Sequence, residues 1–336
     1  MTTHMTPTPD RLDVAHTCHS QTIPRELVHR CSISEVFVTS LWRAQPDLGG
    51  DEFRVGAQLP RMHAYFGDHR GPQAGRHDPL LVMETARQAA IAVTHQFFDV
   101  PLDSAFLVRT FNGVADAPLA DGAWRPGSRP ADVDIAVGIG ARHVVADRLI
   151  GLDMVLAISA DGAPLMTVDG SFSWTTRAQW SALRAQARGG AERGRVHVAE
   201  PAHPHVVGRS DPRNVVVGVR ARDGHETRGE LVVDTAHPGL FDHELDHVPG
   251  TLLLEAARQI AFAHVGTDVR IAAVRSSFGR FVELDRPARC IARTDHACTD
   301  HGHDPADPGA AISVLVTIEQ GGTACAEVRL GVVIGT

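Results

Sequence analysis

The 336-residue chain contains no lysine, so arginine supplies every side-chain cation apart from histidine. This absence excludes enzymes that form a Schiff base on lysine, P-loop nucleotide sites and lysine general bases. Any anionic ligand must then be held by arginine, histidine or backbone N–H groups. A formal net charge of −8 also argues against a general electrostatic attraction to nucleic acid or anionic lipid.

Cysteine is scarce as well, and none of the five cysteines forms a C-x-x-C pair. The histidine-rich stretch 301–304 fits no known zinc spacing, so we predict no disulfide, no metal and no cofactor. The sequence lacks an apolar run of the roughly 18–20 residues that cross a membrane, and its first residues show no apolar signal-peptide core. We therefore predict a cytoplasmic protein with no membrane and no nucleic-acid partner.

The chain contains one internal repeat. Residues 83–92 and 254–263 agree at six of ten positions and are offset by 171 residues, about half of the chain. The preceding segments are also similar, since residues 65–69 read YFGDH and residues 240–243 read LFDH. Agreement of helix, flank and spacing indicates a duplicated fold rather than a chance match.

Each copy shows the same order of expected elements: two strands, one long helix and then further strands. The first copy is predicted to contain strands at 35–41, 52–59, 105–111, 132–138, 154–159 and 166–173 and a helix at 79–98. The second is predicted to contain strands at 214–220, 230–234, 270–275, 289–294, 311–318 and 324–333 and a helix at 249–264. One helix on one mainly antiparallel sheet in each half gives an α+β fold.

A polar, arginine-rich segment separates the two copies. We predict a mobile N-terminal segment at 1–20, a first domain at 21–176, a linker at 177–212 and a second domain at 213–336. The linker is expected to form a short surface helix followed by an extended connector.

The repeated helix combines apolar residues on nearly every face with three polar residues at matching positions. These polar residues are Glu84, Arg87 and Gln88 in the first copy and Glu255, Arg258 and Gln259 in the second. A helix that is apolar nearly all round is expected inside the fold, wrapped by its sheet. A Glu and an Arg three positions apart share a helix face and require partners when they are buried.

Longer motifs extend this pattern. They are the segment from His29-Arg30 to Glu35-Val36-Phe37, the helix HDPLLVMETARQ at 77–88 and the helix FDHELDHVPGTLLLEAARQ at 241–259. Together they resemble the A-factor synthase family, and the resemblance covers residues 22–335. It implies a tandem hotdog fold, in which each copy has a long central helix wrapped by a curled antiparallel sheet.

The resemblance also implies a reaction and its partners. Members transfer a β-ketoacyl group from an acyl-carrier-protein thioester to the hydroxyl of dihydroxyacetone phosphate, the first committed step to a γ-butyrolactone-type signalling molecule. The family's functional residues correspond to Glu84, Glu255 and Arg258, and Arg87 follows from the repeat. The two copies would form a pseudo-dimer within the chain; a homodimer of chains and the final lactone, butenolide or furan product stay open.

These residues allow roles to be assigned. The candidate catalytic residues are Glu255, Arg258, Glu84 and His243, and the candidate substrate-binding residues are Arg87, Gln88, Gln259, His247, Gly250 and Thr251. Glu255 is the expected general base, because burial in an apolar channel raises the pKa of a carboxylate. Backbone N–H groups at Gly250 and Thr251 would bind the thioester carbonyl. Arg258 would bind phosphate or orient Glu255.

The two helix starts differ in one respect. The second copy has Pro249-Gly250 where the first has Asp78-Pro79, so only the second offers glycine for a close approach of substrate. We therefore predict thioester activation at the second helix, with the first completing the pocket. Both helices are expected to face a shared apolar channel in which the acyl chain lies.

Other interpretations remain. The Glu–Arg pairs could be internal ion pairs that brace the helices, and His243 and His247 could be structural residues at the helix start. The chain could also be a dehydratase or thioesterase of acyl thioesters, or a non-catalytic module that binds an acyl chain or lactone. Simple dehydration is disfavoured, because the position eight residues before Pro249 is Phe241 rather than histidine.

Overall fold

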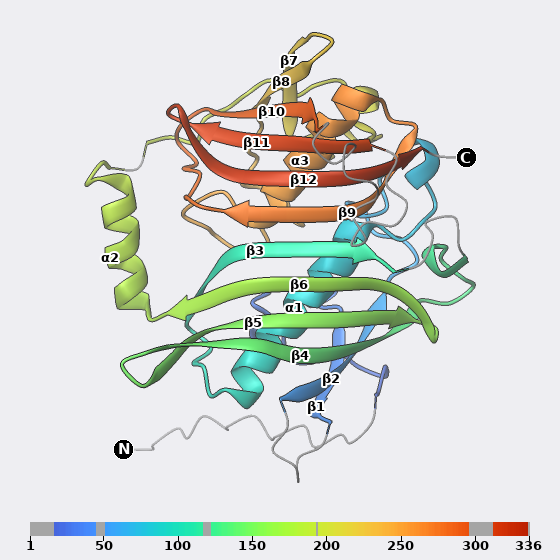
Figure 1. The fold of residues 1–336 in the computed structure, drawn as a ribbon, viewed down its shortest axis with the longest axis vertical. Coiled ribbons are helices and arrows are strands. Elements are labelled where there is room, and N and C mark those ends of the chain that lie inside the picture. Colours follow the sequence, from blue (N-terminus) through green and yellow to red (C-terminus); the bar gives the residue numbers. More distant parts are fainter. Residues whose placement is uncertain (1–16, 45–50, 117–121, 193, 296–311, 335–336) are drawn as a thin grey trace, which may run out of the picture.

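One antiparallel sheet lies over two long helices (Figure 1). The computed structural model describes residues 17–44, 51–116, 122–192, 194–295 and 312–334. Within them, twelve strands follow one another in the order β1-β2-β4-β5-β6-β3-β9-β12-β11-β10-β8-β7. The second half of this order repeats the first half in reverse, as expected for two copies of one fold related by a two-fold axis. The duplicated α+β architecture is confirmed.

The strands and helices agree with the expected pattern. The first copy contains β1 (Val38–Arg43), β2 (Glu52–Leu59), α1 (Pro79–Phe97), β3 (Ala105–Ala115), β4 (Ala131–Val145), β5 (Arg148–Ala160) and β6 (Ala163–Thr175). The second contains β7 (Val217–Arg222), β8 (Glu226–Leu231), α3 (Gly250–Val265), β9 (Val269–Phe278), β10 (Ala288–Thr294), β11 (Ile312–Gln320) and β12 (Thr323–Ile334). Strand β1 starts later than predicted, because Ile33–Glu35 forms a short 3₁₀ helix.

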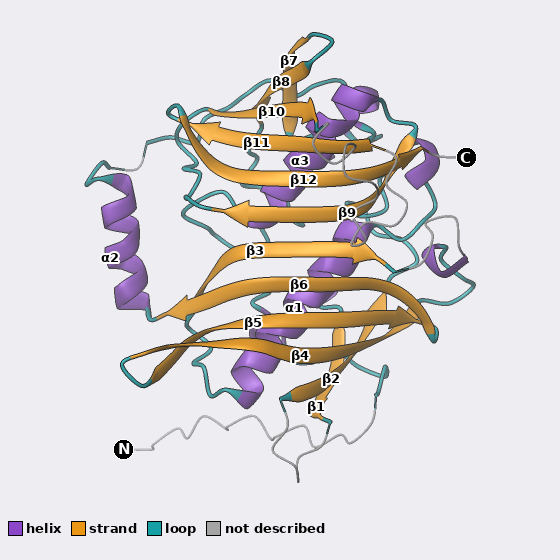
Figure 2. Ribbon diagram, viewed as in Figure 1, coloured by secondary structure: helices purple, strands orange, loops and turns teal. Residues whose placement is uncertain are grey.

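The two central helices begin differently. Asp78 caps α1 by accepting a hydrogen bond from the backbone N–H of Leu80, and Pro79 occupies the first helical position. Helix α3 starts after Pro249, which supplies no side-chain cap. Both helices lie against the same side of the sheet (Figure 2), and nearly all of their side chains are buried. The start of α3 therefore retains backbone N–H groups that no side chain satisfies.

The two copies meet edge to edge. Strands β3 and β9 pair antiparallel, with Thr110 opposite Ser277 and Gly113 opposite Val274. A side chain also crosses this seam, since Asn112 accepts a hydrogen bond from the backbone N–H of Ser276 at 2.9 Å. The sheet is thus continuous through the chain, which closes the inner sheet edge of each copy.

The segment between the copies is only partly a linker. Helix α2 (Arg177–Arg188) is the predicted surface helix, and its Thr176 and Gln179 form a capping box. The extended connector, however, ends before residue 204. Pro204–Val207 and Pro212–Asn214 form 3₁₀ helices that repeat Arg25–Val28 and Ile33–Glu35 of the first copy. These residues are the lead-in to the second domain, because they pack against α3.

The predicted mobile segment 1–20 is only partly described. Residues 1–16 lie outside the described residues, but residues 17–20 are attached to the first sheet. Thr17 donates a hydrogen bond to Asp134 at 2.7 Å, and the backbone N–H of Cys18 donates one to Ser40 at 3.1 Å. This end of the segment therefore contacts the sheet, and the mobility of the segment stays a prediction. None of the described helices is long and apolar enough to cross a membrane.

Candidate active site

Helix α3 holds its polar residues in a sealed cluster. The fully buried carboxylate of Glu255 accepts hydrogen bonds from Arg258, from Gln259 at 2.6 Å and from Arg209 at 3.0 Å. Burial alone would raise the pKa of Glu255, but Arg209 and Arg258 outweigh burial and hold the pKa below its ordinary value. The predicted rise in this pKa is therefore wrong, because the guanidiniums stabilise the charged form.

Asp78 closes this cluster from the other copy. Its carboxylate accepts hydrogen bonds from Arg258 Nη1 at 2.7 Å and from the backbone N–H of Leu80 at 2.8 Å, and it lies 2.8 Å from His69 Nε2. Burial opposes the charge on Asp78, yet Arg258 and His69 hold its pKa below the ordinary range. Two carboxylates and two guanidiniums thus balance one another, and each of these side chains is at most 2% exposed.

Helix α1 carries a similar cluster with fewer partners. The carboxylate of Glu84 accepts hydrogen bonds from Arg30 at 2.5 Å and from Arg87 at 2.8 Å. Burial opposes the charge on Glu84, but these two guanidiniums lower its pKa. The position that corresponds to Asp78 is Pro249 of the second copy, so among the described residues no second carboxylate contacts Arg87. The Arg87 side chain is 24% exposed, against 2% for Arg258.

The lead-in arginines also differ. Arg209 donates further hydrogen bonds to the backbone carbonyls of Tyr65 at 2.7 Å and Asp68 at 2.9 Å. Its counterpart Arg30 donates to Glu84, and among the described residues its buried Nε has no partner. Arg209 also has one buried nitrogen without a hydrogen bond, Nη2, but this atom lies 2.7 Å from the Glu255 carboxylate, whereas among the described residues Arg30 Nε has no such contact.

A narrow cavity lies beside the Glu84 cluster, between the two copies. It is lined by Glu84 and Arg30, by Thr251 at the start of α3, and by mostly apolar side chains: Tyr65, Phe66, Leu80, Met83, Phe111, Leu240 and Leu254. Its interior has room for about one water molecule. The expected shared channel is thus present only as a narrow cavity on the Glu84 side, because Asp78 and Arg209 fill the space beside Glu255.

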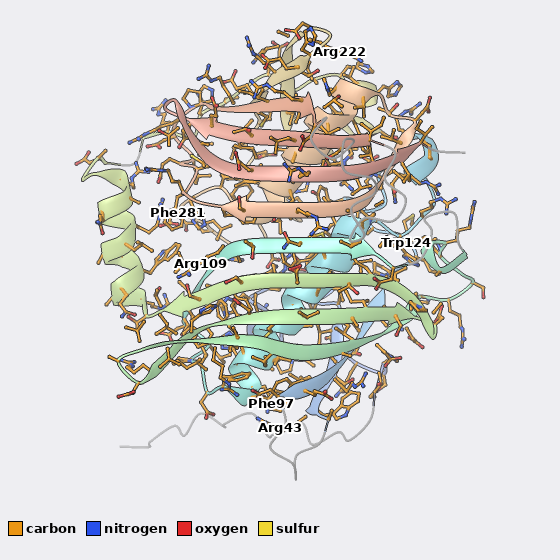
Figure 3. The ribbon with its side chains drawn as sticks, viewed as in Figure 1. Arg43, Phe97, Arg109, Trp124, Arg222 and Phe281 are labelled. Atoms are coloured by element: carbon orange, nitrogen blue, oxygen red, sulfur yellow. The ribbon has the colours of Figure 1, made fainter. Side chains whose placement is uncertain are left out.

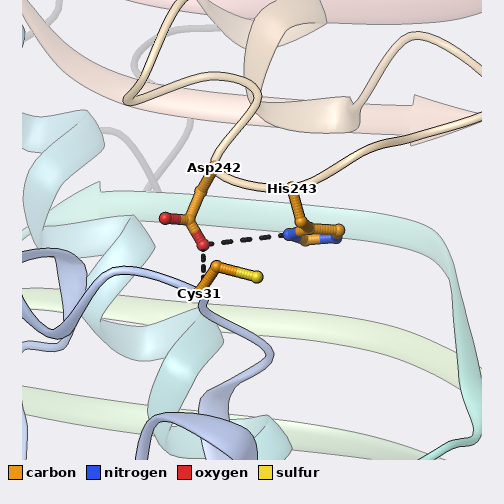
Figure 4. Close-up of side chains that lie close together, drawn as sticks. All are labelled: Cys31, Asp242 and His243. Atoms are coloured by element: carbon orange, nitrogen blue, oxygen red, sulfur yellow. Dashed lines mark hydrogen bonds and ion pairs between the residues drawn. The ribbon is translucent and has the colours of Figure 1, made fainter.

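A loop of the second copy reaches the Glu84 cluster. Asp242 accepts hydrogen bonds from the backbone N–H groups of Cys31 and Ser32, the latter at 3.0 Å, next to Arg30 (Figure 4). His243 lies beside Asp242, with Nδ1 3.8 Å from the carboxylate. Possible metal-binding atoms of Cys31, Asp242 and His243 lie within 4.8 Å of one another, but Asp242 is already used by the backbone. We interpret this group as a contact that places His243 near the site.

The histidines around this cluster are predominantly neutral. Burial lowers the pKa of His243, Asp242 opposes this shift, and Arg30 and Arg87 add to it. Burial also lowers the pKa of His29 to about 3, with contributions from His95, Arg87 and His243. A neutral imidazole beside arginines can accept a proton, which a permanently charged guanidinium cannot.

The whole chain matches one family. The model of the A-factor biosynthesis hotdog domain matches residues 13–176 and again residues 191–334. The chain belongs to the A-factor biosynthesis hotdog family. The family predicted from the sequence motifs is confirmed, and its two matches coincide with the two copies seen in the structure.

Members of this family with curated names are similar over most of the chain. A protein of Streptomyces virginiae named 2-oxo-3-(phosphooxy)propyl 3-oxoalkanoate synthase is 35% identical over 80% of this chain and 86% of its own length. A protein of the same name from Streptomyces coelicolor is 30% identical over 79% of this chain and 80% of its own. Among solved structures, a protein described as an oleoyl thioesterase from Lactobacillus plantarum has a TM-score of 0.51, at 12% identity over 85% of this chain and 96% of that chain. The last similarity confirms the hotdog fold.

Two candidate residues of this family member position the site rather than line it. Gln88 accepts a hydrogen bond from the backbone N–H of Phe37 at 2.9 Å and donates to Glu84 at 2.9 Å. Gln259 does the same in the second copy, with Val216 and Glu255. Both amides are fully buried and occupied within the protein. The prediction that they bind substrate does not agree with these contacts, because backbone groups of the segments before β1 and β7 already occupy the hydrogen-bonding groups of both amides.

His247 also lies away from the site. It forms an ion pair with Asp246 at 2.7 Å, and its ring contacts Trp180 of α2 and Phe281, which Figure 3 labels. The predicted substrate-binding role of His247 is therefore not supported by its position. Gly250, by contrast, has space around it, since an added Cβ would make an ordinary contact with Phe278 at 3.6 Å. No described protein atom requires glycine there.

Several residues of the site were missed by the motif analysis. The structure adds Arg30 and His29 to the Glu84 cluster and adds Arg209, Asp78 and His69 to the Glu255 cluster. All of them precede the central helices by several residues or come from the other copy. A comparison of the repeats around Arg30 and Arg209 could have found the arginines, since Val-His-Arg at 28–30 resembles Val-Gly-Arg at 207–209.

Proposed function

We propose that this chain is an acyltransferase that makes a 2-oxo-3-(phosphooxy)propyl 3-oxoalkanoate. This product is the ester of a 3-oxoacyl group with a hydroxyl of dihydroxyacetone phosphate. The donor would be the thioester of an acyl carrier protein, and the reaction would take place in the cytoplasm as a first step toward a γ-butyrolactone-type signal. The proposal is supported by family membership over nearly the whole chain and by relatives of that name at 30–35% identity.

The reaction is assigned to the Glu84 cluster rather than to the predicted Glu255 cluster. The observation that carries this choice is the cavity, which is lined by Glu84, Arg30 and Thr251 but not by Glu255. The apolar side chains of the cavity suit an acyl chain, and movement of the flexible Met83 would widen it. The second cluster is then a brace, as the alternative interpretation of its ion pairs proposed.

The residues of the first cluster supply the groups that thioester transfer requires. His243 would take the proton of the attacking hydroxyl, because burial lowers its pKa and leaves it neutral at neutral pH. Arg30 and Arg87 would stabilise the negative charge of the acceptor phosphate and of the reacting oxygen. Glu84 is fixed as a carboxylate by both arginines, so its role is to hold them rather than to act as the base.

The activity can be tested directly. Purified protein would be mixed with a 3-oxoacyl carrier protein, or a short thioester mimic, and dihydroxyacetone phosphate, and the products analysed by mass spectrometry. We expect a phosphorylated ester whose formation requires both substrates. Free acid released without the acceptor would indicate a thioesterase instead, and absence of any phosphorylated ester would exclude the proposed activity.

A matched pair of variants tests which helix carries the site. Glu84→Gln should lower the turnover of the protein that remains folded at least about 100-fold, because both arginines lose the group that orients them. It also removes a buried charge between Arg30 and Arg87 and should lower the free energy of unfolding. Glu255→Gln removes a buried charge between Arg209 and Arg258 and should cost about 3–5 kcal/mol in the free energy of unfolding. Residual folded Glu255→Gln protein should retain most of its turnover. The opposite result, with turnover lost only in Glu255→Gln, would assign the reaction to α3.

A further inference from the structure

The two clusters correspond contact by contact. Gln88 and Gln259 each accept a hydrogen bond from a strand lead-in, and Asp242 and Asp68 each accept two from successive backbone N–H groups of the other copy. The corresponding pairs are Arg30 and Arg209, Glu84 and Glu255, Arg87 and Arg258, His243 and His69, and Thr251 and Leu80. The carboxylate of Asp78 has no equivalent among these pairs, because Asp78 corresponds to Pro249.

The contacts of Asp78 differ between its two carboxylate oxygens. Oδ1 accepts from Arg258 Nη1 at 2.7 Å and from the backbone N–H of Leu80 at 2.8 Å. Oδ2 lies 2.8 Å from His69 Nε2. Two oxygens on one carbon, one facing an arginine and a helix N–H and the other facing an imidazole, is the arrangement that acyl transfer requires of its tetrahedral intermediate.

The counterparts of these donors at the Glu84 cluster have no such carboxylate. They are Arg87, the backbone N–H of Thr251 and His243. Arg87 pairs with Glu84 and His243 lies 3.8 Å from Asp242, but among the described residues no carboxylate contacts both Arg87 and His243 in the way that Asp78 contacts both Arg258 and His69. A separate observation also points to a ligand here. Arg30, with 8% of its side chain exposed, lines the same cavity as Thr251, and its buried Nε has no partner in the described part of the chain.

We infer that the Asp78 carboxylate occupies, at the Glu255 cluster, the place that the reacting ester group takes at the Glu84 cluster. This inference rests on the proposed function and assigns its atoms. The hydroxyl oxygen of the acceptor attacks the thioester carbon while His243 takes the hydroxyl proton, forming a C–O bond. The carbonyl oxygen becomes an oxyanion held by Arg87 and the N–H of Thr251. Collapse breaks the C–S bond, and the proton passes from His243 to the departing sulfur.

Each chain then contains one site that is open to substrate, at the Glu84 cluster, and one site that the Asp78 carboxylate fills, at the Glu255 cluster. Asp78 fills the site at the Glu255 cluster permanently, because it is also the N-cap of α1 and is fully buried. The Asp78 carboxylate accepts hydrogen bonds from Arg258 and His69, which would otherwise be buried polar groups without this acceptor. After duplication, one of two equivalent binding sites has thus become a structural ion cluster.

Placing a carboxylate at the position of the second copy that corresponds to Asp78, beside the Glu84 cluster, tests the inference. Pro249→Asp places a carboxylate at the start of α3, where aspartate is a favourable cap, so the variant should fold with an unchanged or higher melting temperature. We expect its turnover to fall at least about 100-fold, because the new carboxylate competes with substrate for Arg87, Thr251 and His243. Pro249→Asn is the matched control: it caps the helix without the charge and should keep turnover within about fivefold of the starting protein. Normal turnover in Pro249→Asp would overturn the inference.

Removing the Asp78 carboxylate from the Glu255 cluster gives a readout that does not depend on activity. Asp78→Gly should lower the melting temperature, and sodium formate should restore part of it by at least about 2 °C more than in the unchanged protein at equal ionic strength of sodium chloride. If the folded Asp78→Gly protein shows no formate-specific rise in melting temperature, the Glu255 cluster does not bind a carboxylate and the inference is contradicted. If the unchanged protein makes no ester while formate stabilises Asp78→Gly, the proposed function is wrong but the carboxylate-binding site at the Glu255 cluster is supported. If ester forms and formate has no effect, that binding site is contradicted and the proposed function is supported.

Discussion

At the residue scale, the two copies are separated by single substitutions around shared chemistry. Arg87 and Arg258 occupy equivalent helix positions, yet Arg258 contacts Asp78, whereas the residue of the other copy that corresponds to Asp78 for Arg87 is Pro249. An arginine with two carboxylate partners is neutralised inside the protein, whereas one with a single partner keeps donors for a ligand. The number of carboxylates around each guanidinium thus distinguishes the two clusters, and under the proposed function it leaves the Glu84 cluster open to substrate.

A pH profile tests the assigned base. The pKa of His243 lies below its ordinary value of 6.5 because of partial burial, although 39% of the side chain is exposed, and because Arg30 and Arg87 lie nearby; Asp242 opposes this shift. Its neutral form therefore predominates at neutral pH, and kcat/KM should stay level down to about pH 6.5 and fall at lower pH as the imidazole becomes protonated. His243→Gln should lower turnover at least about 100-fold and remove this fall. His247→Gln, on the α2 side, is the control and should leave both unchanged.

At the scale of elements, α2 is attached to the second copy by a buried charge cluster. Arg184 donates hydrogen bonds to Glu283 at 2.8 Å and to Asp246 at 2.9 Å, and its guanidinium stacks 4.4 Å above the ring of Phe281. The arginine and Glu283 are only 5% and 6% exposed. The helix thus covers one end of the second domain, although its sequence is polar enough to suggest a solvent-exposed connector.

Breaking this attachment should release the helix. Arg184→Met keeps the apolar stem but leaves Asp246 without its guanidinium partner and Glu283 with Arg188, so the free energy of unfolding should fall by about 3 kcal/mol. Limited proteolysis should then cut within 177–194 faster than in the unchanged protein. Arg177→Met, at an 80% exposed position of the same helix, should change neither quantity measurably. Equal proteolysis rates for both variants would show that the buried cluster does not hold α2.

At the scale of the whole molecule, the two copies form one cooperative body. They share the sheet through β3 and β9, and the sealed cluster contains groups from both: Arg209 and Glu255 from the second copy and Asp78 from the first. Separating the copies would leave these buried charges without partners, at a cost far above that of an exposed ion pair. We therefore expect a single unfolding transition rather than one for each domain.

The buried carboxylates make this stability dependent on acid. The pKa values of Glu84, Glu255 and Asp78 are lowered in the folded protein relative to the ordinary 4.5 and 3.8, so their ionised forms stabilise the fold above those values. This contribution is lost as the pH falls through about 4.5 and below. Urea unfolding between about pH 7 and pH 3 should show a steep loss of the free energy of unfolding below about pH 4.5. A free energy that stays level to pH 3 would contradict the two buried ion clusters.

The sequence by itself determined the duplication, the order of strands and helices, the family and the acidic and basic residues of both helices, since these depend on local periodicity and on motifs. It did not determine which copy holds the site. Arg30, Arg209 and Asp78 reach the helices only because the lead-in segments and the opposite copy fold against them. The pKa of Glu255 shows the same limit: burial alone would raise it, and only tertiary contacts with Arg209 and Arg258 reverse that direction. Charge balance in a buried cluster is a sum over residues distant in sequence, so the tertiary structure alone decided it.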